Sequence, residues 1–266
     1  MSQALSTSDS IETMPIDLPE NQWGYAKRLR FILGTIAAAF PQNSVSSLSV
    51  LDVGCGNGAY VALPLARAGF HVLGLDPHQD SIAHARELAG AMTNAKFTCE
   101  DIENIPSGIF EVVILSEVLE HVANPSELLK RCAGRLKPDG IVIVTVPNGY
   151  GEFEIDSWVY GKLRLQWLVD LLAKPDIQLL ATTDNSSCGH VHFFTLRRIR
   201  RIFSECSLSV FRQGASSWLS GPIIGVTLAR YPRFIAWNAR VSEKLPMGLA
   251  SGWYFALRRQ PFSRAV

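Results

Sequence analysis

A glycine-rich segment and the aspartate that follows it are the residues whose types and spacing most clearly predict chemistry. The segment LDVGCGNG (residues 51–58) places glycines at 54, 56 and 58, where a ligand can approach the backbone without meeting a Cβ atom. Asp76 ends the next apolar run, about 20 residues beyond these glycines, where an acid can accept hydrogen bonds from two ribose hydroxyls. Together the two features predict a site for a nucleoside-containing ligand.

Two further acids help to choose between two kinds of nucleoside ligand. Gly54, Gly56 and Ala59 also satisfy the G-x-G-x-x-A fingerprint of dinucleotide sites, so a nicotinamide-dependent oxidoreductase stays open as an alternative. Asp52, inside the apolar run before the glycines, has no role beside a pyrophosphate but fits the methionine end of a sulfonium cofactor. Asp101, after the third apolar run, can accept a hydrogen bond from an adenine amino group. These acids favour the sulfonium cofactor.

Five segments resemble the successive motifs of class I S-adenosylmethionine-dependent methyltransferases, and they occur in the family order. The segments are LDVGCGNG, GLDPHQDSI, CEDIENIP, FEVVILSEVLEHVANP and LKPDGIVIVTVPN. The resemblance covers roughly residues 45 to 150 and is greatest to the branch that contains ubiquinone-biosynthesis O-methyltransferases and related small-molecule methyltransferases. It implies an enzyme whose cofactor is S-adenosyl-L-methionine and whose reaction requires no metal.

By position, the resemblance implies a set of cofactor-binding residues. The loop around the cofactor would be formed by Asp52, Gly54, Cys55, Gly56 and Gly58. Asp76 would bind the ribose, while Pro77, Asp101 and Ile102 would contact the adenine. Ser116 and Glu117, at the end of the fourth apolar run, would lie near the methionine part and the methyl group.

Three histidines are candidates for a general base: His192, His121 and His190. A hydroxyl acceptor must lose a proton, and histidine, with an ordinary pKa of about 6.5, can accept it near neutral pH. His190 and His192 stand two residues apart in an extended GHVHFF segment, so both would face the same side. We favour His192 slightly, although an ordinary packed histidine explains each position almost as well.

These residues need a parallel sheet to position them, and the chain alternates short apolar runs with helical stretches. We expect strands at residues 49–54, 71–76, 95–100, 110–116 and 141–146, with two final strands at 208–218 and 252–259. We expect helices at residues 21–40, 59–69, 80–92, 125–136, 157–173 and 196–206. A turn at 137–140 would precede the fifth strand, and Thr195 would cap the last helix. The predicted fold is α/β: a Rossmann-like, doubly wound, seven-stranded sheet, mostly parallel with an antiparallel C-terminal strand, and helices on both faces.

The domain organisation follows from this pattern. Residues 1–20 are polar and acidic without a targeting signal, and we expect a flexible tail. Residues 21–266 would form a single domain, with a cofactor-binding core at 45–150 and acceptor-side elements at 151–266. The five cysteines show no CxxC spacing, which argues against a zinc site or a disulfide framework and favours a cytoplasmic protein.

Charge is distributed unevenly along the chain. Residues 195–266 carry 12 basic and 2 acidic side chains, although the whole chain has a net charge of only +1. Such a surface fits an anionic substrate or peripheral contact with a membrane, and the simpler alternative is a solvated helix face. Nucleic acid is not expected, because the fourth motif lacks the DPPY-like signature of enzymes that methylate the amino groups of bases.

The acceptor is the least determined part of the prediction. Aromatic residues of the second half suggest an apolar pocket or a membrane edge, namely Trp158, Trp167, Trp218, Tyr231, Phe234 and Trp237. We expect a small-molecule acceptor that is methylated on a hydroxyl of a lipid-like, quinone-like or glycan-precursor compound. N- or C-methylation stays open as an alternative. Alternatives are a NAD(P)-dependent oxidoreductase and a non-catalytic partner subunit that binds the cofactor.

Overall fold

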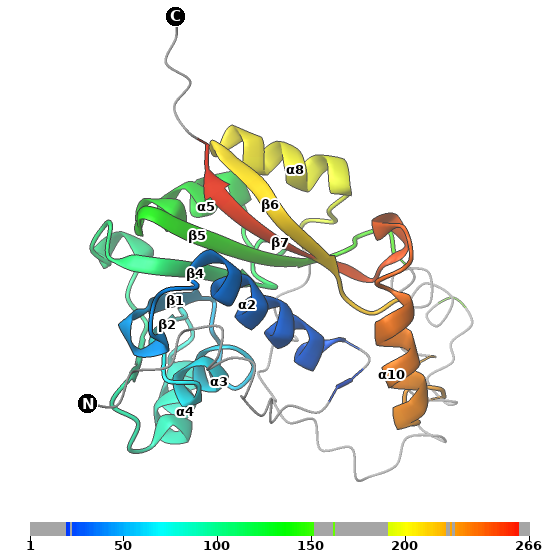
Figure 1. Cartoon of the computed structure of the whole chain (residues 1–266), viewed down its shortest axis with the longest axis horizontal. Coiled ribbons are helices and arrows are strands. Elements are labelled where there is room, and N and C mark those ends of the chain that lie inside the picture. The colour runs from blue at the N-terminus through cyan, green and yellow to red at the C-terminus, as the bar shows by residue number, and fades with distance from the viewer. Residues whose placement is uncertain are drawn as a thin grey trace, which may run out of the picture.

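The computed structural model describes residues 20–21, 23–151, 162, 191–221, 224 and 227–260. Within these ranges the chain forms one seven-stranded sheet with the order β3-β2-β1-β4-β5-β7-β6 (Figure 1). The strands are β1 (Ser49–Val53), β2 (His71–Leu75), β3 (Ala95–Thr98), β4 (Phe110–Ser116), β5 (Leu136–Pro147), β6 (Leu208–Ala215) and β7 (Gly252–Arg259). The sequence predicted all seven strands.

The direction of the strands also agrees with the prediction. Strands β1 to β5 pair in parallel, whereas β7 runs antiparallel to both β5 and β6. One detail differs, because β5 begins at Leu136 and not at Ile141. The predicted turn at 137–140 lies within this strand, where the pairing with β4 shifts register between Phe110 and Val112. An irregularity of this kind lets a Pro-Asp-Gly sequence remain at the end of a strand.

Helices cover both faces of the sheet, as the alternation of side chains along a strand requires. Val112 and Ile114 of β4 pack into the apolar core that contains α2 (Tyr25–Ala39), α3 (Ala62–Arg67) and α4 (Gln79–Ala89). Val113 and Leu115 pack into the opposite core with α5 (Pro125–Gly134) and α8 (Leu196–Glu205). The predicted doubly wound α/β architecture is therefore confirmed.

Local sequence signals fix the starts of several helices. The Thr195 hydroxyl accepts a hydrogen bond from the Arg198 N–H at 3.2 Å, which confirms the predicted N-cap of α8. The Asn124 side chain does the same for the Glu127 N–H of α5. Pro232 occupies the first turn of α10 (Pro232–Val241), where its missing N–H costs nothing.

Other predictions fall outside the described residues. They are the tail at 1–20 except for Glu20, the helix at 157–173 except for Lys162, and the side chain of His190. None of the helices in the described ranges combines the length and apolar composition that spanning a bilayer demands.

Candidate functional site

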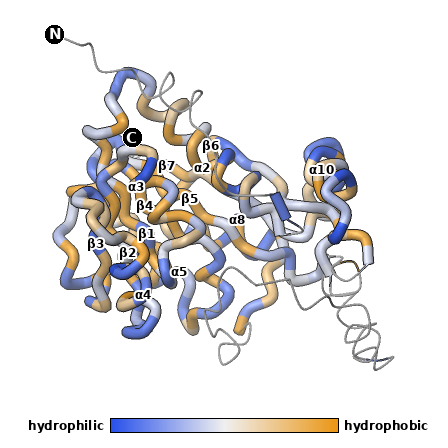
Figure 2. Tube along the Cα trace, turned by 90° about the horizontal axis from the view of Figure 1, so that it is seen from below, coloured by the Kyte–Doolittle hydropathy of each residue, from blue (hydrophilic) through white to orange (hydrophobic). Residues whose placement is uncertain are grey.

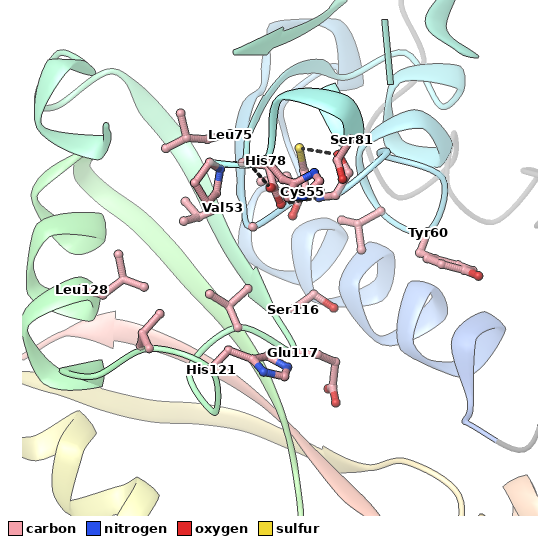
Figure 3. Close-up of a pocket in the computed structure, with 18 of the residues that line it drawn as sticks. Val53, Cys55, Tyr60, Leu75, His78, Ser81, Ser116, Glu117, His121 and Leu128 are labelled. Atoms are coloured by element: carbon pink, nitrogen blue, oxygen red, sulfur yellow. Dashed lines mark hydrogen bonds between the residues drawn. The ribbon is translucent and has the colours of Figure 1, made fainter. Parts of the chain in front are cut away.

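A cavity of about 960 Å³ opens at the carboxyl ends of the parallel strands. It lies where the strand order reverses, because β2 and β3 follow on one side of β1 and β4 and β5 lie on the other. Ligands of doubly wound folds bind at this switch point. Figure 3 shows Ser116 at the end of β4 and Glu117 and His121 on the chain that follows it, with Cys55 and His78 on the other wall. Ten predicted cofactor residues line the cavity: Asp52, Gly54, Cys55, Gly56, Asp76, Pro77, Asp101, Ile102, Ser116 and Glu117.

The glycine loop keeps its shape through left-handed backbone angles. Gly54, Gly56 and Gly58 have φ values of 71°, 53° and 75°, a region that side chains rarely tolerate. A Cβ on Gly54 would lie 2.5 Å from Val118, and one on Gly58 would lie 2.8 Å from Phe97. Gly58 does not line the cavity, so its absence of a side chain serves packing. Only the first two glycines present their backbone to the site.

The Asp76 carboxylate is held in one orientation by two backbone groups. One oxygen accepts from the Gly56 N–H at 2.8 Å, and the other accepts from the His78 N–H at 2.9 Å. A carboxylate has about four acceptor positions, so each oxygen keeps the capacity for one more donor on the cavity side. A vicinal pair of hydroxyls fits this arrangement.

Asp52 lies below the loop at the end of β1, with only 2% of its surface exposed. Burial raises the pKa of its carboxyl to about 8, and the neighbouring charge of Asp76 acts in the same direction, while a hydrogen bond from the Ala62 backbone opposes both. Below about pH 8 the Asp52 carboxyl is therefore mostly neutral. A cationic ligand beside it would favour the charged form.

This raised pKa predicts how stability changes with pH. In the unfolded chain an aspartate titrates near pH 3.9, so between about pH 4 and 8 the folded protein binds more protons here and its stability falls as pH rises. Asp52→Asn should remove this part of the slope. We expect its Tm, relative to the native protein, to rise by several degrees from pH 5 to pH 8.5 in thermal scans.

The exposed acid Asp139 provides the control, because Asp139→Asn should shift neither end of that comparison. A Tm difference between Asp52→Asn and the native protein that stays constant with pH would contradict the assignment.

The end of β4 carries a partly buried ion pair that the sequence did not predict. The Arg28 guanidinium, from α2, donates to the Ser116 hydroxyl at 3.2 Å and pairs with the Glu117 carboxylate at 3.2 Å. Glu117 has a positive φ of 57° and also accepts from the Thr145 hydroxyl at 2.7 Å. A non-glycine residue in this conformation is strained, and such strain concentrates at functional sites.

Arg28 also lines the cavity, and its charge is well placed to meet an anion. The residue is 8% exposed, and its Nε atom has no hydrogen-bond partner among the described residues. The Glu117 carboxylate holds the pKa of the guanidinium above its usual range, although burial opposes this. A permanently charged guanidinium at this end of the cavity is suited to a carboxylate ligand.

The predicted adenine contacts lie together on the opposite wall. Asp101 caps the short helix η2 (Ile102–Asn104) by accepting from the Glu103 N–H at 2.9 Å, while Ile102 is 5% exposed. Pro77 follows β2 and is exposed at the rim. A buried aliphatic side chain beside a fixed carboxylate suits a flat base that carries an amino group.

The candidate histidines are not brought together. His121 lines the cavity, with its Nε2 atom 3.9 Å from the buried carboxyl of Glu120. His192 does not line it: its Nδ1 lies 3.1 Å from the Arg198 guanidinium and its Nε2 lies 3.3 Å from the Ala123 carbonyl. Both ring nitrogens of His192 are thus engaged, and the geometry favours His121 as the residue facing the site.

Aromatic residues near the start of α2 form a further wall. Trp23, Tyr25 and Tyr60 line the cavity, and the rings of the two tyrosines lie 4.3 Å apart. Burial raises the pKa of Tyr25 to about 12, so this phenol is neutral near physiological pH. Burial likewise raises the pKa of the Cys55 thiol, which makes it a poor nucleophile. Neither group is therefore a ready proton acceptor near neutral pH, and His121 stays a candidate.

The sequence did not single out Arg28, because the pattern that could have indicated it is weak. Lys27, Arg28 and Arg30 fall in a helix whose other positions are largely apolar, and a cation in such a setting needs a buried partner.

Comparison with known proteins agrees with this geometry. A family model described as a methyltransferase domain matches residues 25–212. The ubiquinone biosynthesis O-methyltransferase of Bradyrhizobium diazoefficiens is 38% identical over 128 residues, which is 47% of this chain and 50% of that protein. The corresponding protein of Caulobacter vibrioides is 37% identical over 130 residues, 46% and 51% of the two chains. The chain thus spans about half the length of these curated relatives.

Solved structures show the same fold at low identity. Magnesium protoporphyrin IX methyltransferase from Synechocystis, with bound SAH, has a TM-score of 0.52 and 17% identity, with 88% of this chain and 86% of that chain covered. The [4+2]-cyclase SpnF has a TM-score of 0.55 and 15% identity, with 96% and 91% covered. Because a cyclase shares the fold, the family assignment rests on the match over residues 25–212 and on the relatives. By these matches the chain belongs to the class I S-adenosylmethionine-dependent methyltransferases.

Proposed function

We propose that this protein transfers a methyl group from S-adenosylmethionine to a hydroxyl oxygen of a ring-containing, lipid-like or quinone-like small molecule. The observation that carries the proposal is a single cavity that joins the cofactor loop to an aromatic wall and to His121. The names of the relatives, O-methyltransferases of ubiquinone biosynthesis, support oxygen as the acceptor atom and a quinone-like ring.

The cavity residues divide between the parts of the cofactor. Asp76 would bind the ribose hydroxyls, with the backbone of Gly54 and Gly56 beside it. Asp101, Ile102 and Pro77 would contact the adenine. Arg28, held by Ser116 and Glu117, would bind the carboxylate of the methionine part. The residues fit the cofactor chemically, since donors and acceptors of the opposite kind face each of its polar ends.

Bound S-adenosylmethionine supplies a methyl group on a positively charged sulfur. It would supply this carbon to the acceptor oxygen, and its sulfur would keep the electron pair of the broken carbon–sulfur bond. The protein must align the oxygen and exclude water, which the rigid sheet and the aromatic wall can do. His121 would take the hydroxyl proton and Glu120, 1% exposed beneath it, would position the imidazole.

The acceptor half of the cavity comes from both ends of the chain. Ser216, Ser220 and Ser251 line it from the C-terminal elements, and Trp23 and Tyr25 line it near the start of α2. This arrangement supports a single domain over residues 21–266, with the cofactor core at 45–150 and the acceptor side at 151–266. Stacking of an acceptor ring on these aromatic side chains would orient its hydroxyl.

Calorimetry and a labelled methyl group test the function directly. We expect micromolar binding of S-adenosylmethionine and S-adenosylhomocysteine, with no binding of NADH. With methyl-labelled cofactor, a catechol that carries a short isoprenoid tail should become labelled, whereas its doubly O-methylated analogue should not. Preference for NADH would contradict the cofactor assignment, and equal labelling of a matching aniline would contradict the choice of oxygen.

A further inference from the structure

We infer that the outer face of α10 docks on the surface of an anionic phospholipid bilayer and brings the acceptor side of the cavity to the membrane. The inference rests on the proposed lipid-like acceptor. Helix α10 stands apart from the sheet at one end of the molecule in both views (Figures 1 and 2). Its outer face, with the turn before it, consists of Leu228, Arg230, Tyr231, Arg233, Trp237 and Arg240, and we call it the α10 face.

The α10 face combines exposed apolar side chains with arginines. Leu228, Tyr231 and Trp237 are 42%, 53% and 43% exposed. The Arg230 guanidinium lies over the Tyr231 ring at 5.2 Å, and Arg233 and Arg240 flank Trp237 on the exposed side of the helix. Tryptophan and tyrosine favour the boundary between lipid headgroups and acyl chains, where arginine meets phosphate.

The charge of the α10 face indicates the kind of partner that it would bind. No acidic residue occurs between Glu205 and Glu243, and the Glu243 carboxylate faces the Lys27 ammonium at 3.6 Å. No acidic residue in this stretch of the chain offsets the positive charge of the face, and an anionic lipid surface complements that charge. A second copy of this chain fits less well, because a twofold contact would place arginines against arginines.

Helix α10 is joined firmly to the wall of the cavity. On its inner side Asn238 accepts from the N–H groups of Trp218 and Leu219 and donates to the Leu219 carbonyl. The buried Lys27 ammonium donates to the carbonyls of Ser216 and Ala239 at 3.1 and 2.8 Å.

Ser216 and Ser220 line the cavity, so the segment between them ties the cavity wall to the inner side of the helix. A bilayer that held the outer face of α10 would thus lie beside the acceptor half of the site.

Vesicle sedimentation tests the inference. The full chain should bind vesicles with 30% phosphatidylglycerol and bind pure phosphatidylcholine weakly. The double substitution Arg233→Gln with Arg240→Gln should weaken that binding roughly thirtyfold, since each basic residue near a charged surface contributes about a factor of five. The matched control, Arg197→Gln with Arg201→Gln, removes the same charge from exposed positions on α8 and should bind as the native protein does.

Several results would overturn the inference. One is that the native protein does not bind the anionic vesicles, and another is that the α8 control loses as much binding as the α10 variant. A third is that the α10 substitutions change the molecular mass measured by light scattering but leave vesicle binding unchanged. Cofactor affinity and methyl transfer to a water-soluble catechol should stay normal in the α10 variant, while transfer to a tailed catechol embedded in vesicles should fall. Vesicle binding without any methyl transfer would instead contradict the proposed function.

Discussion

Replacing His121 by alanine should lower the rate of methyl transfer at least a hundredfold while leaving the affinity for S-adenosylmethionine unchanged. A positioned general base contributes about two to four orders of magnitude to a rate. His121 lines the cavity near Glu117, whose Oε1 atom is engaged by Arg28 and Thr145. Burial also raises the pKa of Glu120 well above its usual range, so this carboxyl is a poor base at neutral pH. Turnover and cofactor binding should be measured on the same preparation.

Two further variants separate a base from a structural histidine. His121→Gln keeps a polar side chain but cannot accept a proton, so it should be as slow as the alanine variant. Added imidazole should restore part of the activity of His121→Ala. His192→Ala should keep nearly normal turnover, because both ring nitrogens of His192 contact the protein and not the cavity. A slow His192 variant beside an active His121 variant would reverse this assignment.

The fold and the cofactor side of the site could be predicted because their determinants are local. The apolar runs that form β1, β2 and β4 are short, β-branched and bounded by turns, and the structure places them within one or two residues of the prediction. Asp52, Asp76 and Ser116 each lie within one residue of the carboxyl end of a parallel strand. Since such ends meet at one edge of the sheet, adjacency in space follows from the order of the strands.

Arg28 and the acceptor side could not be predicted, because their contacts join residues far apart in the sequence. Arg28 meets Glu117 across 89 positions, and Lys27 reaches Ser216 across 189. Nothing in either local sequence specifies the partner. The position of His192 also depends on such a contact, since the Ala123 carbonyl that engages its ring belongs to a loop after β4.

Replacing Asp76 by alanine should weaken S-adenosylmethionine binding about a hundredfold or more. Two hydrogen bonds to a charged acceptor contribute roughly 1.5 to 3 kcal/mol each, and the variant loses both. Calorimetry with S-adenosylmethionine and with 5′-methylthioadenosine shows which part of the cofactor loses its contact. 5′-Methylthioadenosine keeps the ribose and adenine but lacks the amino acid part, so Asp76→Ala should weaken binding of both ligands by similar factors.

Arg28→Ala provides the contrast to Asp76→Ala. This variant should weaken S-adenosylmethionine binding about tenfold or more through one lost charged contact and leave methylthioadenosine binding unchanged. Arg28→Lys keeps the charge but not the planar guanidinium, so its affinity for S-adenosylmethionine should fall between those of the native protein and Arg28→Ala.

Thermal scans control for misfolding, because Asp76 also accepts from the N–H groups of Gly56 and His78, and Arg28 holds Glu117. If Arg28→Ala weakened both ligands equally, Arg28 would act on the shape of the cavity and not on the carboxylate. If Asp76→Ala spared methylthioadenosine, the ribose would lie elsewhere. Because each variant should affect a different part of one molecule, the pair tests the direction in which the cofactor lies across the ends of β1, β2 and β4, from Asp101 at one end to Glu117 at the other.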